Sequence, residues 1–236
     1  MTQIILAYDL SVFEARQKSL LHNILTEVGL IKLGLETITA GGQTGPTLAD
    51  RIRTFTVSLH NAPKVMWDAK LADIENTVRK AARNIVEREG VGMLTIMASV
   101  SSGALRAGAD TCQKAGVLAL GVTVLTDINE ECESIFGDTP SNKVLQFALR
   151  AKECGLGGIV CSPQELRFLR ERGVTGLSFV TPGIRPKGTD SGDQKRVMTP
   201  GEAAKLGADY IVVGRPIMEA PDPFMAARRI REEANG

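Results

Sequence analysis

Short apolar runs alternate with longer amphipathic segments along the whole chain. Eight runs are short and mostly continuous, as expected for parallel strands that are buried on both faces. They cover residues 4–9, 30–35, 63–68, 93–98, 118–124, 157–161, 177–181 and 210–214. The segments that follow these runs have the apolar spacing of helices. They cover residues 11–28, 45–60, 74–89, 102–115, 141–154, 163–172, 199–206 and 222–233. The pattern therefore predicts eight β/α units.

Turn and cap signals support these boundaries. Pro163 stands at a predicted helix start, where its missing N–H costs no hydrogen bond. Six glycines fall where predicted helices stop, a position that favours a left-handed backbone. They are Gly29, Gly90, Gly116, Gly155, Gly173 and Gly207.

Eight β/α units in 236 residues predict an α/β fold, a single (β/α)8 TIM barrel with eight parallel strands. No Pro/Ser-rich linker and no block of like charge divides the chain, so we expect residues 1–236 to form one domain. A doubly wound open sheet is the weaker alternative, because no G-x-G-x-x-G motif follows the first run. In a barrel, the carboxyl ends of the strands meet at one mouth. Residues at those ends should carry the chemistry.

Composition limits the kinds of molecule that the protein can bind and the cellular compartment in which it works. The chain has 28 Lys and Arg against 27 Asp and Glu, so no overall field favours nucleic acid or an anionic membrane. Its 4 cysteines show no C-x-x-C pair and no nearby His cluster, which argues against structural zinc or a disulfide framework. No apolar run is long enough for a signal peptide or a membrane span. We expect reduced thiols and a cytoplasmic location.

The third predicted strand runs into a D-x-K-x-x-D motif. Asp68 and Lys70 are two residues apart, so on a strand their side chains share a face. Asp73 falls at the junction with the next helix, where a carboxylate can cap free N–H groups. Ile74 and Thr77 share one face of the first helical turn. Taken alone, the motif fits an ion pair plus a helix cap as well as it fits a catalytic site.

Other predicted strand ends add polar groups. The first strand ends in Asp9, and the second contains Lys32 within an apolar run. An unpaired buried ammonium is heavily penalised, so Lys32 needs a carboxylate partner, either Asp9 or Asp68. A purely structural salt bridge satisfies this requirement equally well. Thr126 brings a hydroxyl near the mouth after the fifth strand, although a lone threonine is more often a cap.

The last two strands end in segments that suit a phosphate. The seventh is followed by Thr181-Pro182-Gly183-Ile184-Arg185-Pro186, and the eighth ends in Val212-Val213-Gly214-Arg215-Pro216. These loops of a (β/α)8 barrel often hold phosphate through backbone N–H groups and a cation, and Arg215 is well placed for this. The polar loop 187–196 fits either a solvated surface or a lid. Its position between two such strand ends favours a lid.

In order and spacing, these motifs resemble the orotidine 5'-phosphate decarboxylase family over essentially the whole chain. D-x-K-x-x-D alone is shared with sugar-phosphate decarboxylases and aldolases of the same superfamily, but the combination is specific. The matching segments are Asp9, Lys32, DAKLADIENT at 68–77, VTVLT at 122–126, TPGIRP at 181–186, DQKR at 193–196 and VVGRPI at 212–217. The chain departs from the family at Ala72, where His is frequent, and at Met97-Ala98, where His-Ala is common. These are not catalytic positions in the family, so we expect the departures to affect local packing.

The resemblance implies decarboxylation of orotidine 5'-phosphate to uridine 5'-phosphate in de novo pyrimidine nucleotide synthesis, with no metal or organic cofactor. Loss of CO₂ leaves a poorly stabilised ring carbanion, which needs a nearby cation and a proton. By resemblance Lys70 is the proton donor, and Asp68 lies against the substrate carboxylate. Lys32 and Asp73 complete an alternating network of lysines and aspartates.

The resemblance also assigns substrate contacts and a partner. Asp73, Ile74 and Thr77 would act in the site of a second copy of the chain, so we expect a homodimer. Asp9 and Lys32 correspond to the ribose contacts. The remaining contacts lie on the pyrimidine and phosphate sides of the substrate. They are Thr126, Pro182, Arg185, Gln194, Gly214 and Arg215.

Two alternatives remain at this stage. A keto-sugar-phosphate decarboxylase or aldolase of the superfamily would share the barrel and the motif, but would use Mg²⁺ held by additional acidic residues at strand ends. A catalytically inactive phosphate-binding barrel would keep Gly214 and Arg215 and lose the Lys/Asp set. All five Lys/Asp positions are occupied, which disfavours the inactive barrel.

Overall fold

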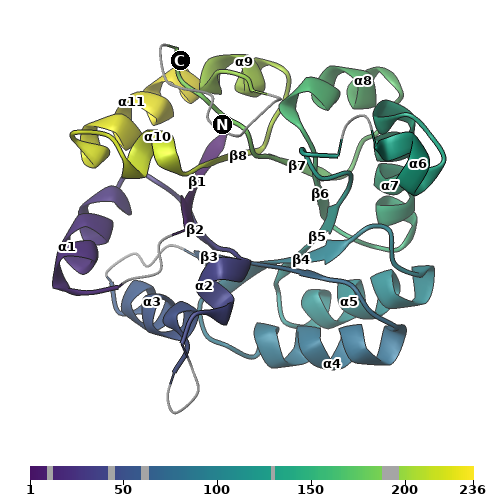
Figure 1. Ribbon diagram of the computed structural model, residues 1–236, viewed down its shortest axis with the longest axis horizontal. Helices are drawn as coiled ribbons and strands as arrows, with labels where there is room; N and C mark the ends of the chain where they lie inside the picture. Colours follow the sequence, from purple (N-terminus) through teal and green to yellow (C-terminus); the bar gives the residue numbers. More distant parts are fainter. Residues whose placement is uncertain (10–12, 42–45, 60–63, 129–130, 188–196) are drawn as a thin grey trace.

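Eight parallel strands form a closed barrel in the computed structural model (Figure 1). The structure describes residues 1–9, 13–41, 46–59, 64–128, 131–187 and 197–236. Each strand pairs with the next in sequence, and the last closes against the first. The strands are β1 (Gln3–Tyr8), β2 (Leu30–Leu33), β3 (Lys64–Leu71), β4 (Val91–Met97), β5 (Leu118–Val122), β6 (Gly158–Val160), β7 (Ser178–Thr181) and β8 (Tyr210–Val213). The predicted TIM barrel is confirmed.

Helices surround the barrel and connect its strands (Figure 1). They are α1 (Ala15–Ile24), α2 (Leu35–Thr39), α3 (Leu48–Val57), α4 (Glu75–Val86), α5 (Ser102–Lys114), α6 (Cys132–Phe136), α7 (Pro140–Glu153), η1 (Pro163–Glu165), α8 (Leu166–Glu171), α9 (Pro200–Lys205), α10 (Arg215–Met218) and α11 (Pro223–Asn235). Each predicted helical segment overlaps at least one of them. Three short helices, α2, α6 and α10, were not predicted, because four or five residues are too few to show a helical period.

Alternating strand residues separate two apolar clusters. Ile5 and Ala7 of β1 belong to a cluster inside the barrel with residues from most of the other strands. Ile4, Leu6 and Tyr8 of the same strand belong to the larger cluster that includes the inner faces of the helices. Burying one large aliphatic side chain contributes about 1.5–3 kcal/mol, so both layers stabilise the barrel. Burial on both faces explains why these strands are continuous apolar runs.

Glycines end most of the helices as predicted. Five of the six candidate positions have positive φ, with Gly29 the exception. At Gly90, φ is 83°, and an added Cβ would lie 2.4 Å from Cγ2 of Val57. A side chain there would be strained by the backbone and would also clash. Gly29 lies several residues beyond the end of α1 at Ile24.

The two ends of the chain lie side by side. The backbone N–H of Thr2 donates to Oδ1 of Asn235 at 3.0 Å, and Nδ2 of Asn235 donates to the carbonyl of Thr2 at 3.1 Å. This contact joins the residue before β1 to the last residue of α11, while the barrel itself closes through the β1–β8 pairing. Separately, within the described ranges no helix has both the length and the apolar character needed to cross a membrane.

Candidate active site

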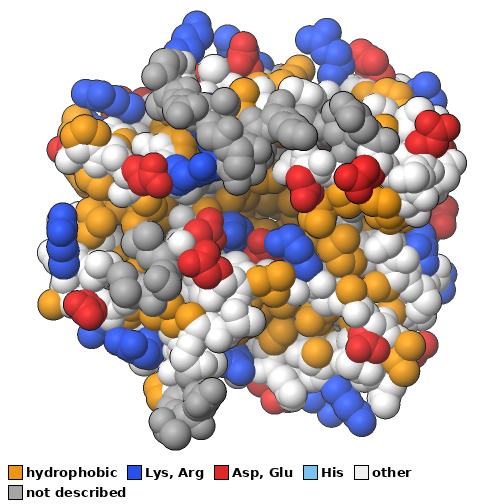
Figure 2. All heavy atoms as spheres, in the orientation of Figure 1, with side chains coloured by type: hydrophobic (Ala, Val, Ile, Leu, Met, Phe, Trp, Pro, Cys, Tyr) orange, Lys and Arg blue, Asp and Glu red, His pale blue; other side chains and the backbone are white. Residues whose placement is uncertain are grey.

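A cavity of about 540 Å³ opens at the carboxyl ends of the strands. Figure 2 shows charged atoms inside the central hollow of this face, with hydrophobic surface around it. Nine of the residues predicted for the site line the cavity. They are Asp9, Lys32, Asp68, Lys70, Thr126, Pro182, Arg185, Gly214 and Arg215. The barrel therefore brings together residues that lie up to about two hundred positions apart in the sequence.

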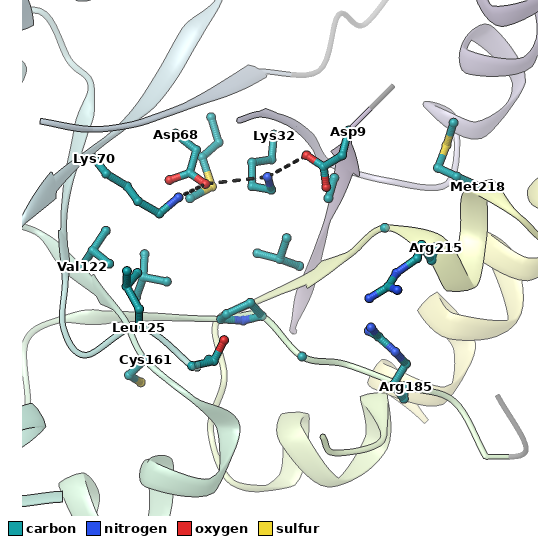
Figure 3. Close-up of a pocket in the computed structure, with 18 of the residues that line it drawn as sticks. Asp9, Lys32, Asp68, Lys70, Val122, Leu125, Cys161, Arg185, Arg215 and Met218 are labelled. Carbon is teal, nitrogen blue, oxygen red and sulfur yellow. Dashed lines mark hydrogen bonds and ion pairs between the residues drawn. The ribbon is translucent and has the colours of Figure 1, made fainter. Parts of the chain in front are cut away.

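Four charged side chains form an alternating row along one wall (Figure 3). Nζ of Lys32 lies 3.1 Å from Oδ1 of Asp9 and 3.7 Å from Oδ2 of Asp68. Nζ of Lys70 donates to the same Oδ2 of Asp68 at 2.8 Å. Both predictions, the shared face of Asp68 and Lys70 and a carboxylate partner for Lys32, are confirmed. Lys32 uses both candidate partners.

Three of the four side chains in the row are shielded from water, whereas that of Asp9 is 53% exposed. The side chains of Asp68 and Lys32 are only 9% and 14% exposed, and Lys70 is 29% exposed. Gly34 leaves room for the first pair, because a Cβ there would lie 3.0 Å from Nζ of Lys32. Charges of opposite sign in such a poorly hydrated site interact more strongly than they would on the surface. The arrangement can hold an ammonium and a carboxylate against the same small ligand.

Lys70 occupies an unusual backbone conformation. Its φ is +48°, and no other non-glycine residue in the part of the chain that the structure describes has a positive φ. The predicted strand stops at residue 68, but β3 continues to Leu71 with an irregular register against β4. Strained conformations of this kind tend to collect at functional sites. Lys70 thus leaves the regular strand at the point where its side chain enters the cavity.

Two arginines stand at the other end of the cavity. Arg185 follows β7 and is buried, and its Nη1 donates to the carbonyl of Ile184 at 2.9 Å. Arg215 is the first residue of α10, directly after β8. Figure 3 shows their guanidinium groups converging at the end of the cavity opposite Lys70. Two convergent guanidinium groups are well suited to an anion with several oxygen atoms, such as a phosphate.

Comparison with known proteins identifies the family of this barrel. A family model described as "Orotidine 5'-phosphate decarboxylase / HUMPS family" matches residues 2–230. The chain belongs to this family. The resemblance found in the sequence motifs is therefore confirmed, and the chain is an enzyme of the orotidine 5'-phosphate decarboxylase group.

Individual relatives extend this likeness over the full length. The chain is 39% identical over 241 aligned positions to an orotidine 5'-phosphate decarboxylase of Moorella thermoacetica, covering 98% of this chain and 91% of that one. A crystal structure of orotidine 5'-phosphate decarboxylase from Lactobacillus acidophilus matches with a TM-score of 0.79 and 31% identity over 100% of both chains. The Pyrococcus horikoshii enzyme matches with a TM-score of 0.76 and 26% identity, covering 99% of both chains.

Three predicted site residues lie outside the cavity of their own chain. Asp73, Ile74 and Thr77 are exposed, and Ile74 is 71% exposed. The prediction that Asp73 caps the helix is wrong, because α4 begins at Glu75 with Ile74 as its N-cap. The carboxylate of Asp73 instead accepts a hydrogen bond from the backbone N–H of Ile74 at 2.6 Å.

Gln194 and most of the proposed lid fall outside the described residues. The structure describes the loop after β7 as far as Lys187 and again from Val197. The assignment of Gln194 to the phosphate side and the lid role of the loop 187–196 stay predictions.

The apolar wall of the cavity received no site role in the sequence predictions, although two of its residues lie within the matching segment VTVLT at 122–126. It faces the row of charges and includes Val122, Leu125, Val160 and Cys161. Burial raises the pKa of the Cys161 thiol well above its usual value, and the charge of Glu165 adds to this effect despite opposition from Arg170. The thiol therefore stays protonated and is unsuited to act as a nucleophile. Single apolar residues at strand ends carry no signal that separates them from the core.

The departure from the family at Met97-Ala98 lies in a well-connected segment. Met97 ends β4, and the carbonyl of Ala98 accepts a hydrogen bond from Nη1 of Arg150 at 3.1 Å. Arg150 also contacts the carbonyl of Val100. These bonds tie α7 to the loop after β4. Ala72, the other departure, is exposed beyond the end of β3.

Proposed function

We propose that this enzyme decarboxylates orotidine 5'-phosphate to uridine 5'-phosphate in de novo pyrimidine synthesis, with Lys70 as the proton donor. The observation that carries the proposal is the alternating row Asp9, Lys32, Asp68, Lys70, with Nζ of Lys70 2.8 Å from Asp68. The relatives named orotidine 5'-phosphate decarboxylase support the choice of substrate.

The row suits the electron flow of this reaction. The bond between the ring carbon and the carboxylate breaks, CO₂ leaves, and the electron pair stays on the ring carbon. The ammonium of Lys70 stabilises that charge and then transfers a proton to the carbon. Asp68, on the same wall, would lie against the substrate carboxylate, so repulsion between like charges favours its departure. Water can return the proton to Lys70 after release of the product.

The cavity has a matching region for each part of the substrate. The phosphate would bind between Arg185 and Arg215, beside Gly214. The ribose hydroxyls would contact Asp9 and Lys32. The ring would lie between the charged row and the apolar wall, with the remaining predicted contacts around it. Those contacts are Thr126 and Pro182, whereas Gln194 would contact the phosphate with the two arginines. Fixing the phosphate far from the reacting carbon lets binding energy position the ring.

We further propose a homodimer in which Asp73, Ile74 and Thr77 act in the partner's site. Their exposure supports this, since residues that face solvent in one chain are available to another. An apolar side chain exposed as fully as Ile74, directly beside the catalytic motif, suits a contact surface. Asp73 would then extend the alternating charges of the neighbouring site.

The magnesium-dependent alternative fits the site less well. It requires carboxylates that are available together for a metal, but Asp9 and Asp68 both contact Lys32. Among the residues that the structure describes, no three His, Cys, Asp or Glu side chains form a group able to hold a metal ion. We therefore expect turnover to survive EDTA. Loss of turnover on chelation, with recovery on adding Mg²⁺, would favour the alternative.

The direct test is the loss of orotidine 5'-phosphate absorbance with purified protein. The wild type should convert the substrate, and Lys70→Ala should lose at least about 10²-fold in kcat while still binding uridine 5'-monophosphate. Lys64→Ala is the matched control, because Lys64 is exposed at the opposite end of the same strand. Activity of Lys70→Ala within about tenfold of wild type would rule out Lys70 as the donor.

We also propose that residues 1–236 form one domain that works in the reducing cytoplasm. All eight strands contribute to one barrel, which supports the first point. The 4 cysteines are buried thiols, which supports the second. Limited proteolysis that released a stable fragment would contradict a single domain, and recovery of the activity mainly outside the cytosolic fraction would contradict the location.

A further inference from the structure

Strand β3 carries three residues opposite a single residue of β4. Trp67 pairs with Leu94, and the next pair is Leu71 with Ile96. Asp68, Ala69 and Lys70 therefore face Thr95 alone. This irregularity is a bulge, a device that re-aims side chains and is over-represented beside active sites. Both charged residues of the D-x-K pair lie within it.

The hydroxyl of Thr95 bonds to both ends of the bulge. It accepts the backbone N–H of Lys70 at 2.9 Å and donates to Oδ1 of Asp68 at 2.9 Å. Oδ1 is the oxygen that does not contact the lysines, because both ammonium groups approach Oδ2. Thr95 is fully buried and does not line the cavity. It cannot touch a ligand directly.

We infer that Thr95 is a positioning residue for the decarboxylation reaction, an assignment that rests on the proposed function. Its hydroxyl holds the Lys70 backbone in its left-handed conformation and orients the Asp68 carboxylate. Both side chains consequently point into the cavity with their charged atoms in contact. A hydroxyl is needed here because it accepts one hydrogen bond and donates another at the same time. Serine retains both bonds, whereas valine, of nearly the same shape, has neither.

Loss of this hydroxyl would leave two buried groups without a partner. The N–H of Lys70 sits in the bulge, where the regular register with β4 is interrupted, and Oδ1 of Asp68 is shielded from water. Unsatisfied groups of this kind drive local rearrangement. A shift of about 1 Å in a catalytic group can reduce turnover by about 10²-fold. Binding of the distant phosphate should be unaffected.

The test compares Thr95→Val and Thr95→Ser with the wild type. Thr95→Val should lose about 10²-fold in kcat, while its Kd for uridine 5'-monophosphate stays within about threefold of wild type. Thr95→Ser should recover most of the turnover. The control is Thr56→Val in α3, which removes another fully buried hydroxyl, one that donates to the carbonyl of Ile52. Turnover of this control should match the wild type.

Amide hydrogen exchange gives a readout that does not depend on activity. The Lys70 amide should exchange faster in Thr95→Val than in wild type and Thr95→Ser, while amides of α3 remain unchanged. If Thr95→Val does not fold, the pair Thr95→Ala and Thr95→Ser carries the same comparison. Turnover of a hydroxyl-free variant within about threefold of wild type, or equal losses in Thr95→Ser and Thr95→Val, would overturn the inference. A wild type that leaves orotidine 5'-phosphate unchanged would instead refute the proposed function, and the exchange data would then decide whether Thr95 holds the bulge.

Discussion

At the residue scale, Lys70 combines the side chain that we propose as proton donor with an unfavourable backbone conformation. An L-residue in the left-handed region costs about 1–2 kcal/mol relative to its ordinary conformations, and glycine avoids most of that cost. The free energy of unfolding of Lys70→Gly should therefore be about 1 kcal/mol higher than that of Lys70→Ala, as measured by urea denaturation. This order is the reverse of the usual one in strands, where glycine is the less stable residue.

The same pair of substitutions at Lys64 provides the control. Lys64 is the first residue of β3 and does not have a positive φ. Among the described non-glycine residues, only Lys70 has one. Lys64→Gly should be less stable than Lys64→Ala. If glycine destabilised both positions equally, the conformation of Lys70 would carry no strain.

A second test at this scale asks whether Arg215 binds the substrate phosphate. Arginine contacts to phosphate are charge-assisted and typically bidentate, so Arg215→Ala should cost about 2–5 kcal/mol in kcat/KM, roughly 30- to several-thousand-fold. Added guanidinium should restore part of the loss. Steady-state kinetics on orotidine 5'-phosphate measure both effects.

Orotidine without its phosphate separates this role from others. Wild type and Arg215→Ala should process the truncated substrate at similar, very low rates, because the deleted side chain has nothing left to bind. Equal impairment on both substrates would mean that Arg215 acts on the fold or the ring site.

At the element scale, the sequence predicts regular structure well and irregular structure poorly. Strands buried on both faces appear as apolar runs, and their polar ends therefore identified the cavity residues from Asp9 to Arg215. The bulge in β3 has no signal in the sequence, because it depends on how β3 pairs with β4. Thr95 was missed for the same reason: its role exists only in relation to Asp68 and Lys70 on another strand. Asp73 was misread as a cap because the first helical turn is set one residue later.

Asp50 links α3 to the segment after α4 and makes the stability of this contact depend on pH. It lies in the first turn of α3, where Thr47 donates to it at 2.8 Å, and it also contacts Arg88, beyond the end of α4. Burial alone would raise the pKa of Asp50. The hydrogen bonds from Thr47 and Arg88 and the charges of Arg88 and Arg53 outweigh burial, so the pKa falls below its usual value.

A lowered folded-state pKa stabilises the protein above the unfolded value, about 3.9, and this contribution is lost as the pH falls through the lower folded value. Asp50→Asn should therefore reduce the free energy of unfolding by about 1 kcal/mol at pH 7, and the difference from wild type should shrink below about pH 4. Urea denaturation at several pH values measures it. The exposed Glu153→Gln on α7 is the control. A difference that did not change with pH would exclude the ionised carboxylate as its source.

At the scale of the whole molecule, the proposed dimer makes each site depend on two chains. Lys70→Ala and Asp73→Ala homodimers should each be nearly inactive. In a two-fold dimer that mixes them, one of the two sites contains both wild-type residues. Half of the dimers in a random mixture are mixed, so about a quarter of wild-type activity should return. Activity assays after subunit exchange provide the measurement. Failure to recover, with exchange demonstrated, would assign Asp73 to the site of its own chain.

The hydrogen bonds between Thr2 and Asn235 hold the two ends of the chain together, so the finished barrel does not require the chain to start at β1. The chain should therefore tolerate circular permutation, with its present ends joined by a short Gly/Ser linker. New ends between Thr175 and Gly176 would lie in an exposed loop before β7, on the face opposite the cavity. We expect this permutant to keep its circular dichroism spectrum and most of its turnover. Loss of the folded state would show that the order in which the β/α units are connected matters, beyond their contacts in the finished barrel.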